Sequence, residues 1–162
     1  MISVYADGSS HSSGGRPGGW AFVVLREGRP LASGNGGHPE TSNNAMELMA
    51  AIRGLQAIER LYPSGTDLFL ELVSDSQYTL GMASGAYSPT RNRELVADLR
   101  QLTKALNPRL RWVKGHGSDV WNNRVDSLAK MAKQRMVAEL LREVTNGIGN
   151  PAVLGSLGAR GV

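Results

Sequence analysis

The chain has 162 residues, of which 41% are hydrophobic and 20% charged, as is typical of one soluble globular domain. It contains no cysteine, which excludes disulfide bridges, thiolate nucleophiles and zinc sites built on cysteine, so any metal must be bound through oxygen or imidazole ligands. The net charge of +4 is too small to identify a partner by itself.

Three strands are predicted in the first quarter of the chain. Polar and apolar residues alternate over 2–7, which is the period of a strand, and Gly8 is expected to end it. After a loop over 9–18, the apolar run 20–25 predicts a second strand, and a third begins at 31–34. The short turn between the second and third strands favours an antiparallel arrangement.

The pattern changes to helical spacing from residue 43. Apolar residues recur three and four positions apart up to Tyr62, and Asn43 or Asn44 is available as the N-cap. The later elements are expected as a buried strand at 68–73, a short helix at 76–82, a long helix at 94–106, a strand at 110–113 and a last helix from about 121 to 132 or 141.

This order of elements predicts an α/β fold in which helices pack on a five-stranded mixed sheet. We expect one domain over 1–142 and a glycine-rich C-terminal tail over 143–162. No apolar run approaches the ~20 residues that a membrane span needs, and the N-terminus lacks the features of a signal segment. The protein is therefore expected to be cytoplasmic and to have no membrane partner.

Four acidic residues fall at predicted strand ends and helix starts, which can converge on one point of an α/β fold. Asp7 ends the first strand, Asp75 follows the fourth, and Glu47 and Asp126 lie in the first turns of two helices. Each also has a local explanation that involves no function. These explanations are a turn at Asp7-Gly8, a capping box from Asn44 to Glu47, a helix cap by Asp75 and a surface ion pair from Asp126 to Lys130.

The sequences around these acids form a set of motifs. They read YADGS at 5–9, NNAMELMAA at 43–51, SDSQY at 74–78, WVKGH at 112–116 and NRVDSLA at 123–129. In sequence and in order, the set resembles the type 1 ribonuclease H family over about residues 1–135. The resemblance implies a ribonuclease H-like fold, with three antiparallel strands followed by two parallel ones. It also implies hydrolysis of the RNA strand of RNA·DNA hybrids to 5′-phosphate and 3′-hydroxyl ends.

By this resemblance, the catalytic acids are Asp7, Glu47, Asp75 and Asp126, and the family's mobile histidine is His116. The resemblance further implies that the four carboxylates hold two Mg²⁺ ions, for which Mn²⁺ can substitute. Mg²⁺ prefers oxygen ligands, and two such ions ~3.5–4 Å apart can bind the attacking water and the leaving oxygen. His116 lies between two glycines. The resemblance implies that His116 acts in proton transfer or product release. The alternative is that it is a surface histidine without a function.

The resemblance also assigns residues that bind the hybrid. Asn43, Asn44 and Gln77, with backbone groups near Gly8, would face the minor groove, where the 2′-hydroxyl distinguishes RNA from DNA. Helix capping is the alternative role of the two asparagines. Ser42 stands where the family's pocket for a DNA-strand phosphate has a threonine.

Two further features concern the binding surface. Between Tyr78 and Glu94 the chain has only about fifteen residues and no tryptophan, so the family's basic protrusion, or handle, is predicted to be missing. The segment 109–135 carries seven basic and two acidic side chains, which is more than the whole positive excess. We expect Lys114 and Arg124 to contact phosphates; the alternative is that this charge only solvates the last helix.

Two other functions compete with this one. A module that binds RNA·DNA hybrid or duplex RNA without cleaving it would not need four carboxylates, so their presence argues against it. A DNA-cleaving relative of the same broad fold matches the SDSQY and GHG segments less well. The protein is expected to act as a monomer.

Overall fold

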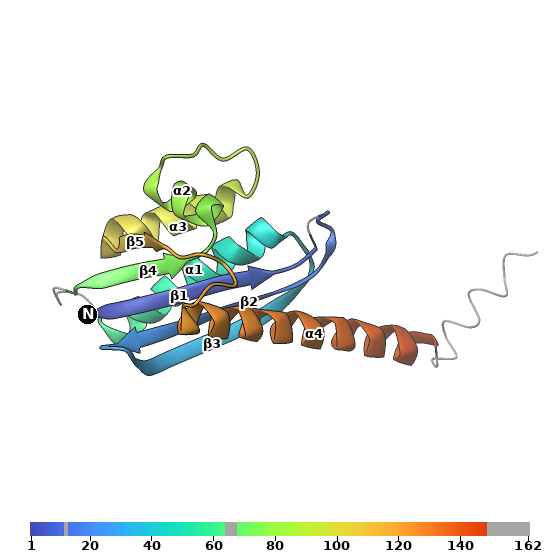
Figure 1. Ribbon diagram of the computed structural model, residues 1–162. Helices are drawn as coiled ribbons and strands as arrows, with labels where there is room; N and C mark the ends of the chain where they lie inside the picture. Colours follow the sequence, from blue (N-terminus) through green and yellow to red (C-terminus); the bar gives the residue numbers. More distant parts are fainter. Residues whose placement is uncertain (12, 64–67, 149–162) are drawn as a thin grey trace, which may run out of the picture.

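The computed structural model describes residues 1–11, 13–63 and 68–148. These residues form an α/β fold around one sheet of five strands in the order β3-β2-β1-β4-β5 (Figure 1). The strands are β1 (Ile2–Ser9), β2 (Arg16–Arg26), β3 (Arg29–Thr41), β4 (Leu70–Ser74) and β5 (Arg109–Trp112). β1, β2 and β3 pair antiparallel, whereas β4 pairs parallel with both β1 and β5. The predicted mixed sheet is confirmed.

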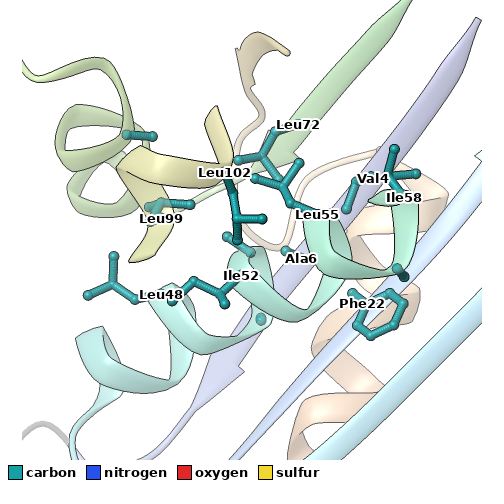
Figure 2. Packing of buried hydrophobic residues seen from close by; sticks show 14 of the residues in the cluster. Val4, Ala6, Phe22, Leu48, Ile52, Leu55, Ile58, Leu72, Leu99 and Leu102 are labelled. Carbon is teal, nitrogen blue, oxygen red and sulfur yellow. The ribbon is translucent and has the colours of Figure 1, made fainter. Parts of the chain in front are cut away.

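Helices cover both faces of this sheet. Within the described residues they are α1 (Asn43–Leu61), α2 (Gln77–Ser84), α3 (Arg93–Leu106) and α4 (Val120–Ile148). α1 packs on one face, and Figure 2 shows the main core there, with Val4 of β1 beside Leu55 of α1. α4 packs on the other face, where Val125 contacts a smaller cluster that includes Tyr5 and Val73. The sheet is therefore the middle layer of the molecule.

β1 is buried along its whole length, because helices cover both of its faces and neighbouring strands pair with both of its edges. The prediction that Gly8 ends this strand was wrong: Gly8 and Ser9 continue the ladder by pairing with Trp20 and Gly19 of β2. Gly8 has another role, since a Cβ at this position would lie 2.3 Å from the backbone nitrogen of Glu47. A glycine is needed for the start of α1 to approach the end of β1.

A serine begins α1. The Ser42 hydroxyl accepts a hydrogen bond from the Ala45 N–H at 3.2 Å, so the N-cap is Ser42 and neither Asn43 nor Asn44. The predicted cap was wrong because all three residues are good caps and the sequence does not distinguish them. The capping box that would have explained Glu47 without function is absent from this helix start, which the structure describes in full.

A serine also begins α2. The Ser76 hydroxyl accepts a hydrogen bond from the Thr79 N–H at 3.1 Å, so Asp75 does not cap this helix. The connection from α2 to α3 is fully described, short and without a helix. This agrees with the predicted absence of a handle.

Several elements are longer than the sequence pattern predicts. β2 begins at Arg16, inside the expected loop, and β3 continues to Thr41, because the glycine-rich segments of these strands pair with each other. α4 extends to Ile148, and its C-terminal part projects beyond the sheet (Figure 1). The expected boundary after residue 142 falls within α4, and the rest of the expected tail, 149–162, lies outside the described residues. None of the described helices contains an apolar stretch long enough to cross a membrane.

Candidate active site

Three carboxylates meet at the carboxyl ends of β1 and β4. Asp7 lies near the end of β1, Asp75 directly follows β4, and Glu47 lies in the second turn of α1. An oxygen from each lies within 4.8 Å of an oxygen from the other two. β1 and β4 are parallel neighbours, so their carboxyl ends meet at one edge, and the missing side chain of Gly8 lets α1 reach that edge. The fold thus brings together three of the four predicted catalytic acids.

Two of these carboxylates are buried and the third, Asp75, is half-buried, all without a compensating cation among the described residues. Asp7 and Glu47 are only 4% and 6% exposed, and in the part of the chain that the structure describes, none of the three carboxylates forms an ion pair. Burial, and next the charge of Asp75, raises the pKa of Asp7 to about 7. Burial, and next the charges of Asp7 and Asp75, raises the pKa of Glu47 well above its usual range. The fold therefore holds these groups close together against electrostatic repulsion.

The donor set fits a hard divalent cation. All three side chains offer carboxylate oxygens, which Mg²⁺ and Mn²⁺ prefer over softer ligands. Glu47 Oε2 is buried and has no hydrogen-bond partner among the described residues, so one ligand oxygen is free inside the group. A cation bound here would satisfy this oxygen and relieve the repulsion.

Backbone and side-chain hydrogen bonds hold two of the acids in place. The Gly8 N–H donates to Asp7 Oδ1 at 2.8 Å. Asn43 Nδ2 donates to Glu47 Oε1 at 3.4 Å, and Asn43 Oδ1 accepts from the Ser10 N–H at 3.1 Å. Asn43 therefore links the end of β1 to a site carboxylate, which is a positioning role that the sequence did not indicate.

Asp75 is held by Asn122, which no sequence motif singled out. Asn122 lies at the start of α4, is 1% exposed, and donates Nδ2 to Asp75 Oδ2 at 3.0 Å. Its Oδ1 has no partner within the described ranges. Asn122 comes one residue before the NRVDSLA motif, and a buried amide at a helix start has no sequence signature of its own. Only the fold reveals that α4 supports the acid at the end of β4.

A network of charged side chains fixes the start of α4. Arg111 of β5 donates to Glu71 Oε1 and Oε2 at 3.2 Å and to the Tyr5 hydroxyl at 2.9 Å. Asp119 lies 3.8 Å from Arg111, and its Oδ1 accepts hydrogen bonds at 3.0 Å from N–H groups in the first turn of α4, including that of Asn122. The network connects α4 to β1, β4 and β5. The one feature of the sequence that hints at this network is Glu71, a charged residue inside an apolar strand.

Asp126, the fourth predicted acid, lies outside the buried group. Its carboxylate pairs with Lys130 at 2.7 Å, as the local explanation predicts, and lies 3.9 Å from His116 Nδ1. Its charge nevertheless helps to raise the pKa of Asp7. The His116 side chain is 78% exposed, and its backbone has a left-handed φ of 53°. The structure thus places the half-buried Asp126 and the exposed His116 together at the rim of the acidic group.

A polar cleft lies beside the acids. Its volume is about 820 Å³, and it is lined by Ser42, Asn43 and Asn44 together with Arg91. The remaining lining residues are Ser10, His11, Tyr78, Thr90 and Asn92. Sequence reasoning did not assign Arg91 or its neighbours to the site, because motif spacing does not determine where loops fold.

The other predicted substrate residues lie elsewhere. Gln77 is absent from the lining of the polar cleft, all of whose residues are described, and instead lines a second cleft between α2 and β5. Lys114 is exposed in the loop after β5, and Arg124 is exposed on α4. The predicted binding residues therefore spread over several surfaces around the acids.

Known proteins share both the sequence and the fold. The RNase H family model matches residues 1–134. Ribonuclease H of Legionella pneumophila (strain Lens) is 34% identical over 148 residues, which cover 83% of this chain and 98% of that protein. Ribonuclease H of Pseudomonas paraeruginosa is 34% identical over 155 residues, covering 88% of this chain and 97% of that one.

Solved structures of ribonucleases H are similar to this fold. LC11-RNase H1, isolated from compost by a metagenomic approach and crystallised with an RNA/DNA hybrid, has a TM-score of 0.74 and 21% identity, covering 85% of this chain and 99% of that one. RNase H1 of the halophilic archaeon Halobacterium salinarum has a TM-score of 0.67 and 25% identity, covering 81% of this chain and 96% of that one. The motifs, the sheet topology and these matches together show that the chain belongs to the ribonuclease H family.

Proposed function

We propose that this protein is an endoribonuclease that hydrolyses the RNA strand of RNA·DNA hybrids and leaves 5′-phosphate and 3′-hydroxyl ends. The observation that carries the proposal is the close group of Asp7, Glu47 and Asp75, two of them buried, with a Glu47 oxygen that has no hydrogen-bond partner among the described residues, in a ribonuclease H fold. The substrate class is supported by LC11-RNase H1, which shares the fold and was crystallised with an RNA/DNA hybrid.

The proposed cofactor is a pair of Mg²⁺ ions, for which Mn²⁺ can substitute. Asp7, Glu47 and Asp75 would hold them inside the fold, and Asp126 would complete the site from the rim. When bound, the ions supply an activated water and stabilise negative charge on the phosphate and the leaving oxygen. The all-oxygen donor set and the repulsion among the buried acids support this assignment.

The chain itself positions the reacting groups. Asp7 is fixed on a strand that is buried on both faces and by the Gly8 N–H. Asn122 orients Asp75 through a hydrogen bond to one of its carboxylate oxygens, as a partner of a metal ligand commonly does. His116 is exposed beside Asp126, where its imidazole is placed to carry a proton between water and a leaving group.

Recognition of the hybrid would use the surfaces around the acids. The amides of Asn43 and Asn44, with backbone groups near Gly8, can donate to or accept from a 2′-hydroxyl, which DNA lacks. The polar cleft contains Arg91 and the Ser42 hydroxyl, a combination suited to a phosphate of the DNA strand. Gln77, Lys114 and Arg124 would contact the duplex on either side of this cleft.

The proposal is tested by cleavage of end-labelled RNA·DNA, RNA·RNA and DNA·DNA duplexes in Mg²⁺ and in EDTA. We expect cleavage of the RNA strand of the hybrid alone, in Mg²⁺ alone, with 5′-phosphate on the products. Binding of the hybrid without any Mg²⁺-dependent cleavage would instead identify a non-catalytic binding module, and cleavage of DNA·DNA would identify a DNA nuclease. The monomeric state, the cytoplasmic location and the domain boundary after residue 142 stay predictions.

A further inference from the structure

A second cleft lies between α2 and β5, next to the acidic site. Its volume is about 420 Å³, and Leu80, Tyr87, Leu110 and Trp112 line it together with Gln77. We call it the aromatic cleft. Unlike the polar cleft, it contains no charged side chain among its lining residues, all of which the structure describes. The protein therefore presents an apolar surface beside a site that is otherwise lined by polar groups.

The two aromatic rings of this cleft are exposed and yet held in place. Trp112 is 50% exposed, and its Nε1–H donates to the backbone carbonyl of Asp75 at 2.9 Å. Tyr87 is 46% exposed and lies against Gly81, where an added Cβ would be 2.4 Å from the ring. Arg100 donates to the Tyr87 carbonyl at 2.7 Å. Glycine is unfavourable inside a helix, and here it makes room for a ring that remains open to a ligand.

The aromatic cleft continues the active-site surface. Trp112 is bonded to the main chain of Asp75, whose side chain belongs to the acidic group. Gln77, the first residue of α2, connects the two surfaces, because it follows Asp75 by two positions and lines the aromatic cleft. A duplex whose scissile phosphate sits at the carboxylates extends beyond them, and the aromatic cleft is joined to the acidic group through Trp112 and Gln77.

We propose that the aromatic cleft packs against sugar rings of the hybrid duplex next to the scissile phosphate, a role that rests on the proposed function. Aromatic faces bind the apolar faces of nucleotides without reading their sequence, which suits an enzyme that acts on hybrids of any sequence. The amide of Gln77, which also lines the cleft, can hydrogen-bond to a 2′-hydroxyl of the same strand. Rings that are fixed before binding lose little freedom on contact.

The test compares Trp112→Leu and Tyr87→Leu with the unmodified chain. Affinity for a hybrid is measured in an Asp7→Asn background, which prevents cleavage during the titration, and kcat and KM are measured with Asp7 present. We expect Trp112→Leu to weaken binding and raise KM by about tenfold, with kcat nearly unchanged, and Tyr87→Leu to do so by about threefold. Trp112→Phe, which keeps a ring, should bind within about twofold of the unmodified chain.

Two controls make the result specific. Phe69 is 67% exposed at the opposite end of β4, so Phe69→Leu should leave hybrid affinity unchanged. The dependence of affinity on salt should stay the same in Trp112→Leu, because no phosphate contact is lost. Melting temperatures show whether each variant is folded; if Trp112→Leu is not, Tyr87→Leu decides the question, since the structure gives its side chain no hydrogen bond among the described residues.

Wild-type affinity in both leucine variants would overturn the proposal, and so would a fall in kcat that Trp112→Phe shares while hybrid affinity is unchanged. The second outcome would mean that Trp112 acts only by positioning Asp75. In either case, continued cleavage of hybrid by the unmodified chain would leave the proposed function standing. Failure of the unmodified chain to cleave hybrid would instead be a failure of the proposed function.

Discussion

The inner and outer parts of the acidic site differ in how their charge is balanced. Asp7 and Glu47 are almost fully buried and have no cationic partner among the described residues. Asp126 at the rim pairs with Lys130 and lies beside the exposed His116. The inner carboxylates therefore have no compensating cation within the described residues, whereas Asp126 has one in Lys130. We infer that the inner carboxylates hold the metal ions, that Asp126 completes their site from the rim, and that His116 serves proton transfer and release.

The largest effect is expected from removing an inner carboxylate. Asp7→Asn preserves the size of the side chain but removes the charge, so hydrolysis of the hybrid should fall by about 1,000-fold or more, the loss expected when several kcal/mol of charge stabilisation disappear. Single-turnover rates of the two proteins provide the measurement. A fully active Asp7→Asn protein would contradict the assignment of the metal to the inner group.

A smaller effect is expected at the rim. His116→Ala should lower kcat by about 10–100-fold and leave measurable activity, because water can replace an exposed proton carrier in part. Steady-state kinetics with saturating hybrid would measure this loss. If His116→Ala were as inactive as Asp7→Asn, the distinction between essential carboxylates and an auxiliary histidine would be wrong.

Substitution of Asn122 tests whether the protein positions the inner carboxylates before a metal binds. Asn122→Ala removes the donor to Asp75 and should weaken Mg²⁺ binding by about tenfold, as is usual when a hydrogen bond to a metal ligand is lost. Calorimetric titration of the metal-free protein gives this value without reference to activity. The neighbouring exposed Asn123 provides a matched control, since its Nδ2 donates only to the Gly117 carbonyl, and Asn123→Ala should bind Mg²⁺ normally.

Substitution of the basic residues should weaken binding of the duplex and leave metal binding unchanged. Lys114→Ala and Arg124→Ala should each weaken hybrid binding a few-fold. Each should also lower the slope of log Kd against log salt by the amount expected for about one phosphate contact. Titrations at several salt concentrations would measure both quantities. An unchanged slope in both variants would support the alternative interpretation, in which the positive charge of 109–135 only solvates the last helix.

The smallest expected effect is on stability without metal. The pKa of Asp7 is raised to about 7 from 3.8, so the folded protein binds a proton that the unfolded chain has lost between these values. In EDTA, the contribution of this group to stability should therefore fall as pH rises from about 4 to about 7. Asp7→Asn should melt higher than the unmodified chain by on the order of 5 °C at pH 8 in EDTA, a difference visible by calorimetry. Mg²⁺ should remove that difference, and a lower melting temperature for Asp7→Asn in EDTA would contradict the account.

The sequence predicted the sheet and the helices because each leaves a local signal: alternation marks β1, and helical spacing marks α1. The inner acids Asp7, Glu47 and Asp75 were predicted from the motifs that resemble those of the ribonuclease H family. What the sequence missed depends on contacts between distant segments. The Asn122 bond to Asp75 and the approach of α1 to Gly8 arise only when the layers pack.

Helix starts and loops were the other source of error. Ser42, Asn43 and Asn44 all suit an N-cap, and the structure shows that the extended residue before the helix is Ser42. Arg91 joins the polar cleft because the short connection before α3 folds back toward α1, which composition alone does not predict. The sequence thus predicts which residues are chemically able to act, while the packing decides which of them meet.

The most direct test of the central claim is hydrolysis of one end-labelled RNA·DNA hybrid by the unmodified chain and by Asp7→Asn, each titrated with Mg²⁺ from an EDTA-treated start. The account predicts cleavage of the RNA strand that rises with Mg²⁺ in the unmodified chain and is absent in Asp7→Asn at every concentration. Cleavage that is unaffected by EDTA, or equal in the two proteins, would contradict it.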